Sequence, residues 1–133
     1  MSTRPPAGPA QLAIIRIAML LGVLLFGAVA WMRHRHGIDA DTTADPSILR
    51  LVGGAILVIS IASIIVIRTR LDSAREAGMR VTLATLGWAS GEMAGVFGAA
   101  YWFLVGDPRL FFVGLVVLLA SFMLIPVRPE RLR

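Results

Sequence analysis

Four long apolar stretches, separated by short polar ones, make up most of this chain of 133 residues. They cover residues 12–32, 49–67, 81–105 and 109–126. A membrane-spanning helix takes about 20 apolar residues, within a range of about 17 to 25. The first three stretches therefore qualify by length, whereas the uninterrupted apolar part of the fourth, residues 110–125, is short. Because lipid admits only helices and closed barrels, the pattern predicts an all-α fold, a four-helix transmembrane bundle.

The polar boundaries predict where helices begin. Asp45-Pro46 precedes the second stretch and Asp107-Pro108 precedes the fourth. In each pair the aspartate can cap the helix, and proline suits the first helical position, where its missing N–H is not needed. The connection between the third and fourth helices is so short that these two must form an antiparallel hairpin.

Charge predicts the orientation of the bundle. Only 16% of residues are charged, whereas soluble domains carry about 25%. All 13 basic residues are arginine, and nine lie on the side of the 68–80 loop and the two ends, against four on the other side. By the positive-inside rule, the tails 1–11 and 127–133 are cytoplasmic and residues 12–126 form a membrane domain. We expect the inner (plasma) membrane of a bacterium.

A second interpretation of the first stretch stays open. Arg16, the apolar run 17–27 and the small residues Ala28-Val29-Ala30 are typical of a signal peptide with its cleavage site. Cleavage there would leave three helices with the new N-terminus outside. The continuation of the apolar run through Trp31 and Met32 favours an uncleaved helix.

Missing residue types exclude several chemistries. The chain has no cysteine and no lysine, so disulfides, thiolate metal ligands, Schiff bases and a P-loop are excluded. Its two histidines share one loop and cannot hold a haem between helices. We therefore expect no enzyme activity and no cofactor. Arginines that flank apolar runs indicate anionic lipid as their partner and not nucleic acid.

Glu92 is the most unusual residue, because it lies near the middle of the third apolar stretch. A charge there opposes membrane insertion by about 2.5 to 3.5 kcal/mol. One interpretation is an ion-binding or proton-carrying carboxylate. The other is a protonated side chain that forms hydrogen bonds between helices. The sequence leaves both open.

A stripe of small residues lies next to Glu92 on the same helix. Gly87, Gly91, Gly95 and Ala99 recur every four residues, and Gly98 widens the stripe. Such a stripe lets another helix backbone approach closely. It predicts helix packing, either within the chain or at a seam with another subunit.

The run from Glu92 to Gly98 (Glu-Met-Ala-Gly-Val-Phe-Gly) resembles the ion-binding helix of the proteolipid c subunit of ATP synthase. That resemblance implies that Glu92 is the ion-binding carboxylate. It covers one helix of four, and the 68–78 loop lacks the proline typical of that family. The chain as a whole is similar to small, uncharacterised bacterial four-helix membrane proteins with such a glutamate, a resemblance that implies no activity.

Two further groups are weaker candidates. The loop after the first stretch offers possible metal ligands, but the neighbouring arginines would repel a cation, so we expect a solvated loop: His34, His36, Asp39 and Asp41. Arg16 lies one turn inside the first stretch. It either extends to the lipid headgroups or forms an ion pair with Glu92.

These features predict a small integral membrane protein that serves as a subunit or accessory of a membrane complex through helix association. Its expected partners are the lipid bilayer and either further copies of the chain or another membrane protein. The alternative is a proton- or ion-translocating component that uses Glu92.

Overall fold

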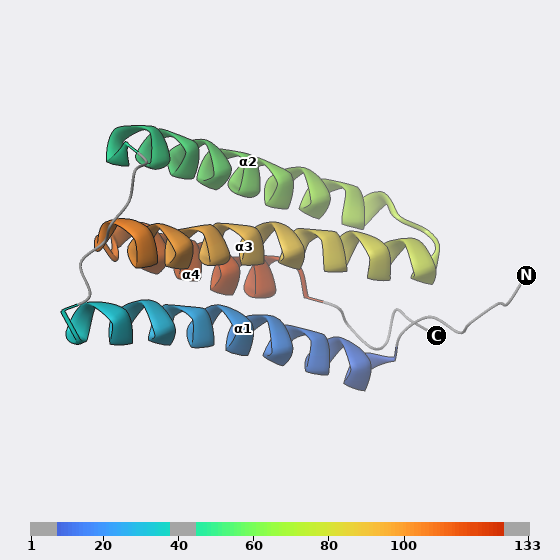
Figure 1. Cartoon of the computed structure of the whole chain (residues 1–133). Helices are drawn as coiled ribbons and strands as arrows, with labels where there is room; N and C mark the ends of the chain where they lie inside the picture. The colour runs from blue at the N-terminus through green and yellow to red at the C-terminus, as the bar shows by residue number, and fades with distance from the viewer. Residues whose placement is uncertain (1–7, 38–44, 127–133) are drawn as a thin grey trace, which may run out of the picture.

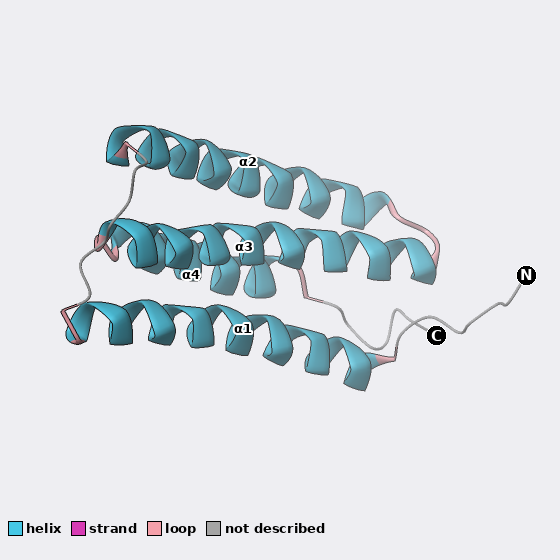
Figure 2. Ribbon diagram, in the orientation of Figure 1, coloured by secondary structure: helices cyan, strands magenta, loops and turns pink. Residues whose placement is uncertain are grey.

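The structure, a computed structural model, describes residues 8–37 and 45–126. Within these residues it consists of four α-helices without any β-strand (Figures 1 and 2): α1 (Pro9–Arg35), α2 (Pro46–Ser73), α3 (Ala77–Val105) and α4 (Arg109–Leu124). The predicted all-α class with four helices is confirmed. The first three helices extend beyond their apolar stretches at one end or both.

Helix α3 is the centre of the bundle and packs against the other three helices. Helices α1 and α2 flank it on opposite sides (Figure 1), and α4 packs along it with the most extensive contact. Successive helices run in opposite directions, so α4 runs toward the end of the bundle where α1 begins, although it stops short of that end. We call this end, which also holds the α2–α3 turn, the terminal end, and the other the hairpin end.

The helix starts follow the predicted aspartate–proline signals with one difference. Asp45 accepts a hydrogen bond from the backbone N–H of Ser47 (2.8 Å), and Pro46 is the first residue of α2. Asp107 accepts from the N–H of Arg109 in the same way (3.0 Å). However, α4 begins at Arg109, so Pro108 is its N-cap and not its first helical residue.

The α3–α4 hairpin depends on glycine at its turn and along its contact. Gly106 ends α3 with φ +89°, a conformation that disfavours any side chain. A Cβ atom at Gly98 would lie 2.5 Å from the backbone oxygen of Leu110. A Cβ atom at Gly114 would lie 2.9 Å from the Cα atom of Gly95. The two backbones therefore touch, which only glycine permits at these positions.

Helix α4 is much shorter than its partner. It has 16 residues against 29 in α3, a difference of about 20 Å at 1.5 Å per residue. The two helices are level at the hairpin end, and Ile125 packs against Gly87, ten residues after the start of α3. The last carbonyl groups of α4 therefore lie within the length of the bundle and not at its terminal end.

Apolar composition differs among the helices. By length and composition, α1 and α2 are the two helices in the described residues that can cross a membrane, and only 17% of the most apolar window of each is buried. Helix α4 is apolar but short. Helix α3, which we expected to qualify, falls short of the same mean hydropathy; Glu92 and its glycine residues are among those that lower it.

Candidate functional site

Glu92 lies halfway along α3 and faces an open groove. The side chain is half-buried. The groove has a volume of about 410 Å³. One residue of α2 and six residues on one face of α3 line it: Ile56, Ala89, Glu92, Met93, Val96, Phe97 and Ala100. Glu92 is the only ionisable residue in this lining. The groove is thus an apolar depression with a carboxyl group in it.

Glu92 makes no hydrogen bond and no ion pair with any other described residue. The interhelical hydrogen bond that one interpretation of the sequence predicted does not form within this part of the chain. The ion pair with Arg16 does not form either. The described residues thus leave the hydrogen-bonding capacity of the carboxyl group unused.

The stripe of small residues lies on a different face of α3 from Glu92, and all five of its members are buried: Gly87, Gly91, Gly95, Gly98 and Ala99. Gly91 and Gly98 face the backbone of α4, and Gly87 faces Ile125 just beyond it. A Cβ atom at Gly95 would lie 2.8 Å from Val23 of α1. In this structure the stripe is therefore used for packing within the chain.

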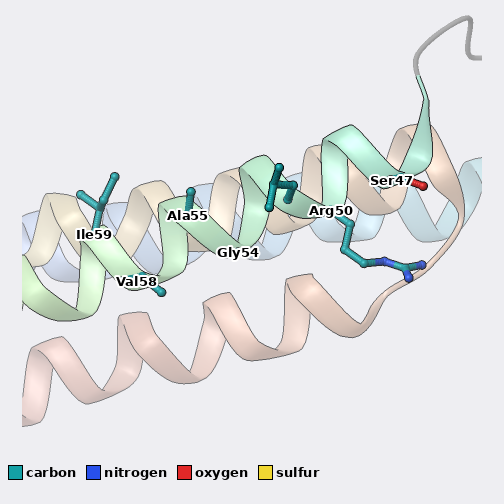
Figure 3. A pocket seen from close by; sticks show the side chains of 7 residues that line it. Ser47, Arg50, Gly54, Ala55, Val58 and Ile59 are labelled. Atoms are coloured by element: carbon teal, nitrogen blue, oxygen red, sulfur yellow. The ribbon is translucent and has the colours of Figure 1, made fainter.

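A second hollow lies along α2 (Figure 3). It has a volume of about 730 Å³, and its lining residues fall at helical spacing on one face of the helix: Ser47, Arg50, Leu51, Gly54, Ala55, Val58 and Ile59. Arg50 lies near its hairpin end, and the rest of the lining is almost wholly apolar. This face of α2 is largely uncovered by the described residues.

A cluster of donors surrounds the end of α4. Arg16 of α1 donates from Nη2 to the backbone oxygen of Ile125 (2.9 Å). Trp88 of α3 donates from Nε1 to the same oxygen (3.2 Å). Arg68 of α2 donates to the preceding carbonyl, that of Leu124. All three other helices thus supply a hydrogen-bond donor to the two carbonyls that end α4. We call this set of Arg16, Arg68, Trp88 and the two carbonyls the end cluster.

Arg16 also stacks on two aromatic rings, that of Trp88 within the end cluster and that of the neighbouring Phe122. Its guanidinium carbon lies 4.2 Å from the centroid of the Trp88 ring and 5.8 Å from that of Phe122. The sequence predicted that this arginine extends to the headgroups or pairs with Glu92. The ion pair with Glu92 does not form, and the guanidinium group contacts the end of α4 and the Trp88 ring. The shortness of the fourth apolar stretch, followed by Pro126, was the signal that could have revealed this role.

The candidate metal loop is described only in part. His34 donates from Nε2 to the backbone oxygen of Trp102 (2.8 Å), near the end of α3. His36 is exposed, and Asp39 and Asp41 lie outside the described residues. Within the described ranges, no three histidine, cysteine or acidic residues are close enough to hold a metal ion. Within this part of the chain, His34 therefore forms a hydrogen bond between α1 and α3 and not a metal site.

Comparison of the chain with protein-family models, curated proteins and solved structures finds no match. The likeness of residues 92–98 to the proteolipid helix therefore stays a local resemblance.

Proposed function

We propose that this chain is an inner-membrane protein whose four antiparallel helices all cross the bilayer. Large apolar side chains on the outer faces of α1 and α2 support this: Leu25 is 69% exposed and Leu51 is 75% exposed. Helices that belong to a soluble core would bury such residues. Helix α3 needs less hydropathy than α1 and α2 because the other three helices surround much of it.

Arginine supports a cytoplasmic location for the terminal end and for both termini. Four arginines lie on or beside the α2–α3 turn at this end: Arg68, Arg70, Arg75 and Arg80. Three further arginines belong to the C-terminal tail. The arginines of the hairpin end are fewer: Arg33, Arg35, Arg50 and Arg109. The positive-inside rule places the side with the arginine excess in the cytoplasm.

The protein acts, in our proposal, as a subunit or accessory of a membrane complex, and the groove at Glu92 is where a partner helix binds. The unpartnered carboxyl group carries this proposal. In a bilayer such a group is unfavourable by about 2.5 to 3.5 kcal/mol when nothing compensates it. A partner helix that offers a serine, threonine, asparagine or glutamine side chain would satisfy the carboxyl group and fill the apolar depression. The glycine stripe is already used within the chain, so association takes place on another face.

A second function, proton or ion translocation through Glu92, is favoured by the same side chain for a different reason. Because no described residue holds the carboxyl group by a hydrogen bond or ion pair, the group is available to a transported ion or proton when a partner supplies a path to water. The resemblance of residues 92–98 to a proteolipid helix agrees with this candidate. A structural contact needs only the hydrogen bond, whereas translocation needs ionisation.

Two substitutions separate these functions. Native mass spectrometry of the gently purified protein should show a fixed complex with a partner or with further copies. Glu92→Gln keeps the hydrogen bond and should keep the complex, whereas Glu92→Ala should lose it. Ser90→Ala is the matched control, because Ser90 bonds only to its own helix, at the Leu86 carbonyl. A wild-type protein that runs as a lone monomer would contradict the association proposal.

Proton flux into vesicles that contain the purified complex tests the second function. Translocation predicts that Glu92→Gln leaves the complex intact but abolishes a flux that the wild type shows. An intact Glu92→Gln complex with undiminished flux would reject a proton-carrying role for this residue.

A further inference from the structure

The end cluster brings together two positive charges. Arg16 and Arg68 come from different helices and donate to consecutive carbonyls, those of Ile125 and Leu124. Both guanidinium groups are therefore held at the same end of α4, on neighbouring carbonyls. This capping explains why each arginine reaches the helix end, but it engages only one nitrogen of each guanidinium group.

The positive charge of the cluster exceeds what the end of α4 can balance. The C-terminal end of a helix carries about half a negative charge, whereas the two arginines carry two positive charges. Neither forms an ion pair with a carboxylate in the described residues, where the one ion pair joins Arg109 and Asp107 at the hairpin end. Arg16 Nε is buried, and no described residue supplies it with an acceptor. The cluster is thus short of both negative charge and hydrogen-bond acceptors.

The surroundings of the cluster specify the kind of anion. Arg68 is exposed, and Met123 and Leu124 beside it are 82% and 43% exposed. A ligand that binds here meets guanidinium groups and apolar side chains together. A phospholipid has both parts, a phosphate for the guanidinium forks and an acyl chain for the apolar surface. Anionic lipids are enriched in the cytoplasmic leaflet, on the side where we place this end of the bundle.

We infer that Arg16 and Arg68 bind the headgroup phosphate of an anionic phospholipid at the end of α4. This inference rests on the proposed membrane location. The short α4 provides the site, because its end stops within the bundle where two arginines cap it. A longer fourth helix would place its last carbonyls in water, where neither arginine would be needed to cap them.

The test compares lipids with the same acyl chains on the full-length protein in an uncharged detergent. Phosphatidylglycerol should raise the unfolding temperature more than phosphatidylcholine does, and native mass spectra should retain it at lower concentration. Arg68→Gln should reduce this preference about tenfold, as expected for loss of one charge-assisted contact. Arg70→Gln is the matched control, because it removes the same charge two residues away and should keep the preference.

Three outcomes would overturn the inference. The first is equal stabilisation of the wild type by the two lipids. The second is an equal loss of preference in Arg68→Gln and Arg70→Gln, which would indicate general surface charge. The third is an equal effect of inorganic phosphate at the same concentration, which would indicate a free anion as ligand. Extraction of native membranes with alkaline carbonate distinguishes failure of the lipid site from failure of the proposed membrane location. Release of the protein would contradict the membrane location itself. Retention of the protein without a lipid preference would contradict only the lipid site.

Discussion

Arg16 and Ile125 are separated by 109 positions in the sequence, yet the arginine Nη2 atom lies 2.9 Å from the isoleucine backbone oxygen. This hydrogen bond joins the first helix to the end of the last one. It exists because α4 stops early, which leaves carbonyl groups that have no intrahelical partner. A charged side chain of the apolar helix α1 thus caps the C-terminal end of α4.

The first prediction concerns this hydrogen bond. Arg16→Gln should lower the free energy of unfolding by about 1 to 3 kcal/mol, because it removes a charged donor from the backbone oxygen of Ile125, a buried residue. Thermal unfolding followed by tryptophan fluorescence in detergent measures the change. Arg75→Gln, with the same loss of charge at an exposed position, should change stability by less than about 0.5 kcal/mol. Equal effects of the two substitutions would show that Arg16 contributes only through net charge.

The stacking of Arg16 on Trp88 gives a second prediction. Trp88→Phe keeps an aromatic face but removes the N–H that Ile125 accepts, so it should destabilise by about 1 kcal/mol. Trp88→Ala also opens a cavity and should destabilise by about 3 to 5 kcal/mol. In a double-mutant cycle of Arg16→Gln and Trp88→Ala, we expect a coupling free energy of about 0.5 to 2 kcal/mol. Strict additivity would show that the ring and the guanidinium do not interact.

Glycine packing gives the third prediction. Gly98→Ala and Gly114→Ala place a methyl group against backbone that cannot move aside, so each should destabilise by about 1 to 3 kcal/mol. Gly22→Ala and Gly54→Ala are matched controls in α1 and α2, because a Cβ atom there meets nothing within 4 Å. These controls should stabilise the helix by about 0.4 to 1 kcal/mol.

The readout for the glycine series is the midpoint of unfolding in a denaturing detergent or urea titration. A neutral Gly98→Ala would contradict the packing of α3 against α4, and a destabilising Gly54→Ala would contradict the open space beside α2. Gly95→Ala should fall between the two classes, since it meets the side chain of Val23 and a side chain can shift.

Sequence patterns predicted much of this fold because the signals were local. Apolar stretches fixed the number of helices, and Asp45-Pro46 fixed the start of α2 to the residue. The short connection at Gly106 fixed the hairpin of α3 and α4. At Pro108 the prediction was one residue early, because this proline adopts a helical conformation as the N-cap without joining the hydrogen-bonded helix.

The sites depended on contacts between distant segments, which periodicity does not reveal. Glu92 was identified from its position in an apolar run, but its lack of a partner required the placement of α2. The spacing of the small residues showed a stripe, yet only the packing of α1 and α4 showed that this chain fills it. The role of Arg16 depended on where α4 ends relative to α1, a relationship between residues more than a hundred positions apart.

The fourth prediction tests whether Glu92 is retained for a partner or for the fold. Glu92→Leu should leave the free energy of unfolding of the isolated chain unchanged or raise it, because no described residue forms a hydrogen bond or ion pair with the carboxyl group and the groove around it is apolar. The same substitution should abolish the complex seen by native mass spectrometry, since leucine offers no hydrogen bond to a partner. Met93→Leu, a volume-conserving change in the same groove, should leave both stability and complex intact. A Glu92→Leu protein that unfolds more readily as an isolated chain would show that the carboxyl group stabilises the fold of its own bundle. That result would contradict the proposal that the groove binds a partner.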